Sequence, residues 1–171
     1  MAGAIEIGSE AIRHVLIGEI RIASSGLLKA TLGSCVAMAL IDKKRSVCGL
    51  AHCLLPYTPV GKQPVDARFA DRALKNLLRA GGWEEQRLRG VNGFLAGGAR
   101  MIPENGVSRL TVGEMNVSAA QATFDEHRIR YTVLEVGGTE GYTVILDCDA
   151  QTVTCSKLRR MTSEGKETPW S

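Results

Sequence analysis

Two short apolar runs on either side of a charged turn constrain the fold of this chain more than any other feature. The first run covers residues 35–41 (CVAMALI) and the second covers residues 47–55 (VCGLAHCLL). Between them lies the turn sequence DKKR at residues 42–45. Apolar runs of strand length that are joined by a short polar turn are typical of a β-hairpin. The sequence therefore predicts two antiparallel strands here, followed by a proline-rich loop.

Two helices are expected after the hairpin. From Asp66 onward, apolar residues recur at spacings of three and four until the diglycine at residues 81–82. This pattern predicts a helix with one buried face that the glycines end. Ser118 and Gln121 have the spacing of a capping box, which predicts that a second helix begins there and continues through about His127.

Strands account for most of the remaining apolar residues. They are expected at four places, namely residues 90–95, residues 129–136, the run after Tyr142 and the run around Val153. Because two helices interrupt these strands without a regular alternation, the predicted fold class is α+β. Since no repeat or low-complexity linker divides the chain, residues 1–161 are expected to form a single domain. The polar residues 162–171 are expected to be a disordered tail.

Charge and hydropathy exclude several classes of function. The net charge is only +3, from 21 basic and 18 acidic residues, and no dense basic cluster is interleaved with aromatic residues. This does not favour a nucleic-acid partner. No segment approaches the ~18 apolar residues of a membrane span, so no membrane insertion is expected. The N-terminal residues do not resemble an export signal, so we expect a cytoplasmic location.

The cysteines do not form a structural framework in the sequence. There are five of them, Cys35, Cys48, Cys53, Cys148 and Cys155. The number is odd and no CxxC pair occurs, so neither a set of disulfides nor a zinc site is predicted. No metal is expected, and at least one thiol is free to do chemistry.

The hairpin offers a local route to a thiol–imidazole pair. If the chain turns tightly on Lys43 and Lys44, Cys35 lies directly opposite His52, where cross-strand Cβ atoms are about 4.5–5.5 Å apart. A four-residue loop shifts the partner by two positions, which keeps both side chains on one face and within diagonal reach. Only a loop of odd length would place them on opposite faces.

This pairing suits nucleophilic catalysis. A thiol is mostly protonated at neutral pH, and a neighbouring imidazolium lowers its pKa and supplies the thiolate. Gly33 and Ser34 precede the thiol, and a flexible backbone there can bring N–H groups to a reacting carbonyl as an oxyanion site. The alternative interpretation is that the cysteine and histidine are ordinary core residues. Cys48 and Cys53 are interpreted as core residues.

The residues around this pair resemble the CheD family, the chemoreceptor glutamine deamidases of bacterial and archaeal chemotaxis. The resemblance covers roughly residues 30–155, and His52 lies seventeen residues after Cys35. The matching motifs, in family order, are TLGSCVA at residues 31–37, Ala51-His52, Leu55-Pro56, Phe69-Ala70-Asp71, AGGA at residues 96–99 with Met101, Val112-Gly113, Asn116-Val117 and Gly137-Gly138.

The resemblance implies a fold of layered β-sheets flanked by helices and related to cysteine-dependent deamidase toxins. It implies a Cys–His–Thr site in which Cys35 attacks and His52 transfers protons. Family members place a threonine five or six residues before the cysteine, where this chain has Ala30 and Lys29, so Thr31 is the candidate third member. The implied reaction converts glutamine side chains of methyl-accepting chemoreceptors to glutamate through a thioester, without a cofactor.

Two other functions remain open at this point. The chain could act mainly as an adaptor that binds chemoreceptors and a CheC-type phosphatase, a partner that the resemblance also implies. It could also be a cysteine hydrolase that acts on another amide or ester, because a fold and a nucleophile do not determine the substrate.

Overall fold

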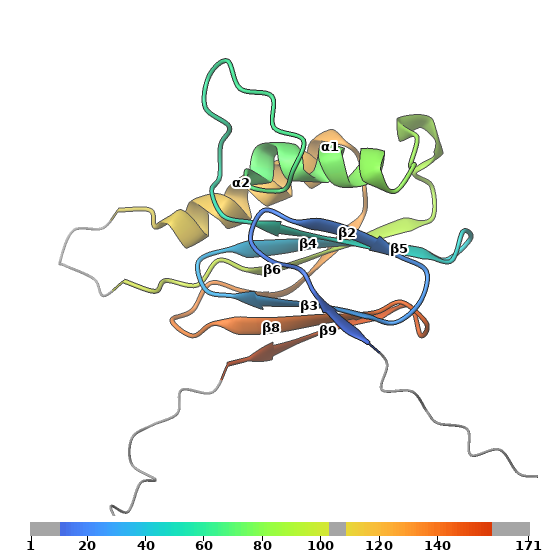
Figure 1. The fold of residues 1–171 in the computed structure, drawn as a ribbon. Helices are drawn as coiled ribbons and strands as arrows, with labels where there is room; N and C mark the ends of the chain where they lie inside the picture. Colours follow the sequence, from blue (N-terminus) through green and yellow to red (C-terminus); the bar gives the residue numbers. More distant parts are fainter. Residues whose placement is uncertain (1–10, 103–108, 159–171) are drawn as a thin grey trace, which may run out of the picture.

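The computed structural model describes residues 11–102 and 109–158, and these form three layers (Figure 1). Two helices lie on one face of a five-stranded sheet, and a four-stranded sheet covers its other face. The predicted α+β class and the layered arrangement are thereby confirmed. The tail predicted at residues 162–171 lies outside the described residues. Within the described part, no helix is long and apolar enough to cross a membrane.

The predicted hairpin forms the centre of the five-stranded sheet. The strands lie in the order β2 (Ile20–Ala23), β5 (Val47–Cys53), β4 (Val36–Asp42), β6 (Val91–Gly97) and β7 (Tyr131–Val136). Every residue of β4 is buried. This explains its continuous apolar sequence, because a central strand that is covered on both faces has no polar side.

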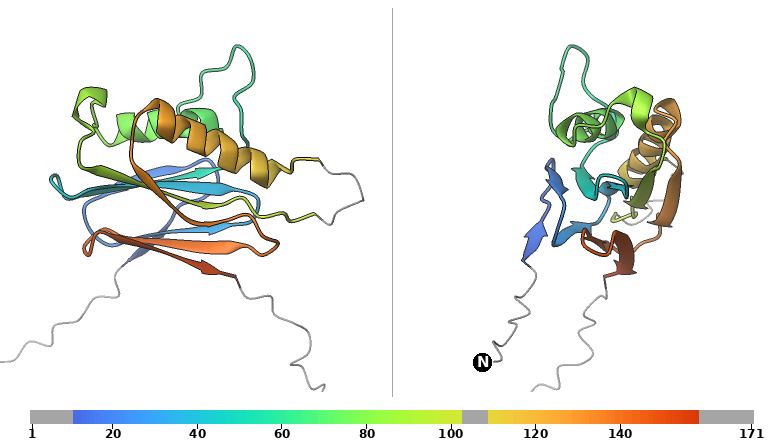
Figure 2. Two further views of the ribbon diagram at one scale, coloured as in Figure 1. Left: turned by 180° about the vertical axis from the view of Figure 1, so that it is seen from behind. Right: turned by 90° about the vertical axis from the view of Figure 1, so that its right-hand side faces the viewer.

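The second sheet consists of strands from both ends of the chain. Its order is β1 (Ile12–His14), β3 (Leu27–Leu32), β8 (Tyr142–Asp147) and β9 (Thr152–Lys157). Strand β3 pairs antiparallel with β8 and in parallel with β1. Figure 2 shows this sheet lying below the hairpin sheet, with the two helices on the far side.

The first predicted helix is confirmed, and the predicted start of the second is wrong. Helix α1 covers Ala70–Ala80 and ends at Gly81, and a short 3-10 turn, η1, follows at Glu85–Arg87. Helix α2 covers Val112–Glu126, so Ser118 lies in its interior instead of at its cap.

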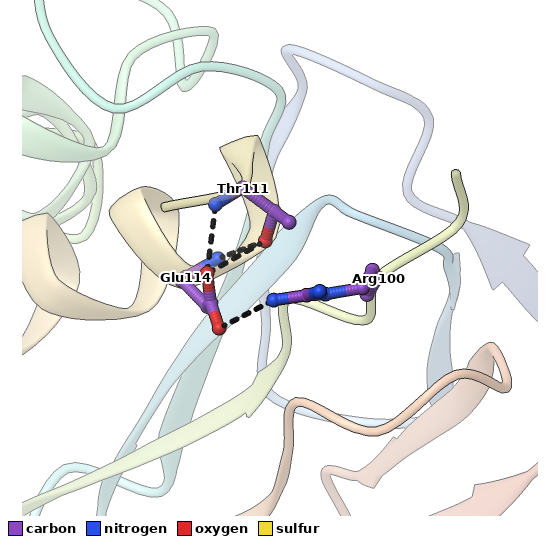
Figure 3. Close-up of polar contacts among 3 residues, drawn as sticks. All are labelled: Arg100, Thr111 and Glu114. Atoms are coloured by element: carbon purple, nitrogen blue, oxygen red, sulfur yellow. Dashed lines mark hydrogen bonds and ion pairs between the residues drawn. The ribbon is translucent and has the colours of Figure 1, made fainter. Parts of the chain in front are cut away.

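The actual cap of α2 is a capping box between Thr111 and Glu114. The Thr111 hydroxyl accepts from the main-chain N–H of Glu114, and the Glu114 carboxylate accepts from the N–H of Thr111 at 2.7 Å (Figure 3). Arg100 forms an ion pair with the same carboxylate at 3.3 Å. The first turn contains Gly113, whose lack of a side chain hides the helical pattern from a periodicity analysis.

Two buried clusters fill the spaces between the layers. One lies between the helices and the hairpin sheet and includes Met38, Leu77 and Phe124. The other lies between the two sheets and includes Leu28 and Leu50. Along β4 and β5, alternate residues therefore face either the helices or the second sheet.

Candidate active site

The register of the hairpin places Cys35 and His52 on one face. Ala37 pairs with His52 and Val36 pairs with Cys53, so the loop contains the four residues 43–46. This is the register predicted for a four-residue loop. Cys35 precedes β4 and has the same parity as Ala37, and both belong to the cluster between the sheets. The thiol is thus diagonal to His52 on the same side of the sheet.

The His52 ring is buried and held by one hydrogen bond. Only 3% of the residue is exposed, and Nδ1 lies 2.8 Å from the main-chain oxygen of Val15. Because a carbonyl oxygen can only accept, Nδ1 carries the proton and the neutral ring presents a lone pair at Nε2. Nε2 is buried, and within the described residues it has no hydrogen-bond partner. That atom is free to accept a proton.

The segment that supplies the Val15 carbonyl is itself tied to His52. The main-chain N–H of Gly18 donates to the His52 oxygen at 2.9 Å, and the His52 N–H donates to the Glu19 oxygen at 3.1 Å. The N–H of Val15 donates to Lys29 on β3. Sequence analysis missed this contribution because a main-chain carbonyl carries no residue-type signal.

Burial favours the neutral forms of both candidate groups. It raises the pKa of the Cys35 thiol, and a hydrogen bond to its own backbone offsets this only in part. Burial lowers the pKa of His52, against smaller opposing effects of the Val15 hydrogen bond and the Glu19 charge. Both shifts favour a thiol and a neutral imidazole at rest over the thiolate–imidazolium pair expected from the sequence.

The turn that carries Cys35 is fixed through its three carbonyl oxygens. The Gly33 oxygen accepts from the N–H of Ala99 at 3.0 Å, and the Cys35 oxygen accepts from the N–H of Gly98 at 2.8 Å. The Ser34 oxygen accepts from the side-chain amide of Asn116 at 2.9 Å. These three hydrogen bonds hold the backbone of the turn in place through its carbonyl oxygens.

Gly97 at the end of β6 is required for the close approach of this turn. Its φ of +108° is one that side chains rarely adopt. A Cβ atom added there would also collide with the main-chain oxygen of Cys35. A glycine is therefore needed at this position next to the nucleophile.

Thr31 does not lie on the side of β3 that faces His52. Ala30 and Leu32 on either side of it are buried in the cluster between the sheets, whereas Thr31 is exposed. Its side chain therefore lies on the outer face, beside a shallow hollow that Gly33, Met101 and Glu140 also line. The structure places Cys35 and His52 on one face of the hairpin, with Gly33 and Ser34 leading into Cys35, whereas Thr31 lies on the outer face of β3 beside Gly33.

The remaining cysteines are structural or peripheral. Cys53 is buried on the helix side of the hairpin sheet, and burial raises the pKa of its thiol. Cys48 and Cys148 are buried between the sheets, so the interpretation of Cys48 and Cys53 as core residues is confirmed. In the described part of the chain, no group of three or more histidine, cysteine or acidic residues could hold a metal ion.

Comparison with known proteins assigns the chain to a family. Residues 54–157, more than half of the chain, match the family described as CheD chemotactic sensory transduction. The chain belongs to the CheD family. The matched segment begins just after His52, so it leaves the roles of Cys35 and His52 to be argued from the geometry.

Individual CheD proteins are similar over most of their length. The chain is 38% identical over 130 residues to a probable chemoreceptor glutamine deamidase CheD of Bdellovibrio bacteriovorus, covering 75% of this chain and 83% of that protein. It is 34% identical over 139 residues to a protein of the same description from Archaeoglobus fulgidus, covering 81% and 87%. The resemblance found in the sequence motifs is therefore confirmed.

Proposed function

We propose that the chain converts glutamine side chains of methyl-accepting chemoreceptors to glutamate, with Cys35 as nucleophile and His52 as base. The substrate follows from family membership and from the description of its relatives as chemoreceptor glutamine deamidases. The observation that carries the residue assignment is the buried His52 ring. Its Nδ1 is hydrogen bonded to the Val15 oxygen, and its Nε2, which has no partner among residues 11–102 and 109–158, belongs to the residue on the same face of the hairpin as Cys35.

In the first half of the reaction, the sulfur of Cys35 replaces the nitrogen of the carboxamide. His52 Nε2 takes the thiol proton as Cys35 Sγ attacks the carboxamide carbon, which gives a tetrahedral oxyanion. When this intermediate collapses, the C–N bond breaks, and protonated His52 gives its proton to the leaving nitrogen. The products of this half are ammonia and a thioester at Cys35.

In the second half, water replaces sulfur. Neutral His52 takes a proton from water as the oxygen attacks the thioester carbon. Collapse of the second intermediate breaks the C–S bond and returns the proton to the thiolate. The net reaction consumes one water, releases ammonia and leaves a glutamate side chain on the receptor. It regenerates the neutral thiol and imidazole.

The Val15 carbonyl takes the orienting role that the family resemblance gives to a threonine. A hydrogen bond from Nδ1–H to an acceptor fixes the tautomer and stabilises the imidazolium that forms during attack. The Val15 oxygen supplies this acceptor at 2.8 Å, whereas the Thr31 hydroxyl faces away. We therefore assign Thr31 no part in the proton transfers.

The N–H groups of Ser34 and Cys35 are the proposed oxyanion donors, with Gly33 giving the turn its flexibility. Main-chain N–H groups that point at the developing charge stabilise it without reorganisation during the reaction. The carbonyls of the same turn are held by Gly98, Ala99 and Asn116, and this holds the N–H groups in place.

We also propose that the chain binds a CheC-type phosphatase. The proposed compartment is the cytoplasm. The family resemblance supports the first, and the five free thiols are compatible with the second. Mixing the chain with a CheC-type phosphatase and measuring the mass of the eluted complex tests the partner directly. Separate elution at micromolar concentrations would exclude a stable complex.

The activity itself is tested on a cytoplasmic fragment of a chemoreceptor. Conversion of glutamine to glutamate raises the mass of the peptide by about one dalton, because OH replaces NH₂. We expect this gain with the wild-type chain and with Cys155→Ala, which removes a partly exposed thiol on β9. We expect no gain with Cys35→Ala or His52→Ala. Unchanged conversion by Cys35→Ala would overturn the assignment of the nucleophile.

A further inference from the structure

We propose that Asn116 is a positioning residue that orients the Ser34–Cys35 peptide, so that the Cys35 N–H stabilises the oxyanion. Asn116 lies in α2, in the layer on the opposite side of the hairpin sheet from His52. The inference rests on the proposed function, because it assigns a role in the reaction of Cys35.

Asn116 links the two halves of the site with one side chain. It is fully buried, and its Nδ2 donates to the Ser34 oxygen at 2.9 Å and to the Leu54 oxygen at 3.0 Å. Ser34 directly precedes the nucleophile, and Leu54 lies two residues after His52. A single amide group thus fixes the backbone on which each reacting side chain is mounted.

The hydrogen bond to Ser34 also determines the direction of the neighbouring N–H. The Ser34 carbonyl and the Cys35 N–H belong to one planar trans peptide, in which the two groups point in opposite directions. When Asn116 holds the carbonyl toward α2, the N–H points away from α2. A hydrogen bond to the carbonyl also polarises the peptide and makes its N–H a stronger donor.

The fold brings the first turn of α2 against the backbone of Gly98, whose N–H is hydrogen bonded to the Cys35 oxygen. A Cβ atom on Gly113 would collide with the main-chain oxygen of Gly98, so the first turn of α2 can pack here only as glycine. Asn116 lies one helical turn further along the same face of α2. This approach places a short amide within reach of the turn.

The bonding of Asn116 is asymmetric. Both Nδ2 contacts are made, but Oδ1 is buried and has no partner among the described residues. An unsatisfied buried acceptor is unfavourable. The position therefore keeps an amide for its two donors, although its oxygen gains no hydrogen bond.

Asn76 provides a matched control on the other helix. It is also buried, and its Nδ2 donates to the oxygens of Pro64 and Asp66 at 2.9 and 2.8 Å. The residue type and the pattern of two main-chain acceptors are the same, but Asn76 holds a loop and not the nucleophile turn. Asn76→Ala therefore measures the effect on kcat of losing a buried side-chain amide that does not contact the nucleophile turn.

The test compares deamidation with alkylation of the same thiol. Alkylation of Cys35 by iodoacetamide is a displacement at a saturated carbon and forms no carbonyl oxyanion. For Asn116→Ala we expect kcat on the receptor fragment to fall by about 10- to 100-fold, less than the loss of a direct oxyanion donor. We expect KM and the alkylation rate of Cys35 to stay within about threefold, since neither depends on the oxyanion. Asn76→Ala should keep kcat within about threefold.

Several results would overturn the inference. One is an unchanged kcat in Asn116→Ala. Another is an equal loss of kcat and of the alkylation rate of Cys35, because Asn116 would then only hold the thiol in place. An equal loss in Asn76→Ala would reduce the effect to general destabilisation. If Asn116→Ala does not fold, Asn116→Asp, which keeps the shape but loses both donors, is assessed by the same criteria.

Cys35→Ala separates this inference from the proposed function. If Cys35→Ala deamidates as fast as the wild type, the nucleophile assignment fails and the role of Asn116 fails with it. If activity depends on Cys35 but Asn116→Ala keeps the wild-type kcat, only the role of Asn116 fails.

Discussion

The Nδ1 atom of His52 lies 2.8 Å from the main-chain oxygen of Val15, on a segment that precedes the catalytic hairpin by about twenty residues. A backbone atom is thereby the group that orients the proposed base. Because the backbone of Val15 is itself bonded to Lys29 on β3, the second sheet fixes the ring that the first sheet carries. The site thus depends on the packing of the two sheets.

Thr31 is expected to be dispensable for catalysis. Thr31→Val removes the hydroxyl but keeps the shape of the side chain on an exposed strand position. Since His52 is held by Val15, kcat on a chemoreceptor fragment should remain within about threefold of the wild type. A loss of tenfold or more, in a variant with an unchanged melting temperature, would return the orienting role to Thr31.

The pH dependence should be that of a neutral pair. Protonation of His52 removes the base, and burial lowers the pKa of its ring. As the pH is lowered, kcat/KM should therefore begin to fall only below pH ~6.5, the ordinary pKa of histidine. Burial raises the pKa of Cys35, so ultraviolet absorbance should detect no Cys35 thiolate at neutral pH. The matched control is Cys35→Ala. A thiolate signal at neutral pH that this variant lacks would instead indicate an ion pair.

Gly97 should affect catalysis in a way that Gly90 does not. Both have positive φ, but a Cβ on Gly90 meets nothing within 4 Å, whereas one on Gly97 collides with the Cys35 oxygen. Each alanine variant should lose about 1 kcal/mol of unfolding free energy through backbone strain, and Gly97→Ala should lose more because of the collision. Only Gly97→Ala should also lower kcat, by up to about 100-fold, because it displaces the nucleophile turn. Equal kcat values for the two variants would contradict this account of the turn.

The N-cap of α2 should contribute to stability at Thr111 and not at Ser118. Thr111→Ala removes the hydroxyl of the capping box and should lower the free energy of unfolding by about 1 kcal/mol. Ser118 is exposed in the helix interior, so Ser118→Ala should change it by less than about 0.5 kcal/mol. Urea denaturation measures both variants, and a larger loss at Ser118 would be inconsistent with the observed cap.

The sequence was informative where local pattern determines structure. The hairpin and α1 followed from apolar periodicity, and the shared face of Cys35 and His52 followed from the parity of the loop. Strands β1, β2 and β3 were not predicted. Two of them have only three or four residues, and their pairing partners lie elsewhere in the chain.

The groups that surround the site could not be predicted for a related reason. Val15 acts through a carbonyl, which every residue has. Asn116 is separated from Ser34 by more than eighty residues, and only the packing of α2 brings them together. The neutral state of the pair also depends on burial between the sheets, which local spacing does not reveal.

In the proposed reaction, Cys35 forms a covalent thioester with the side chain of the receptor glutamine. The most direct measurement is the mass of the protein after acid quenching of a reaction with a receptor peptide. We expect an adduct at Cys35 with the mass of protein plus peptide less one ammonia, which hydroxylamine releases and Cys35→Ala lacks. Continued deamidation without any adduct at Cys35, together with full activity of Cys35→Ala, would contradict the proposed reaction.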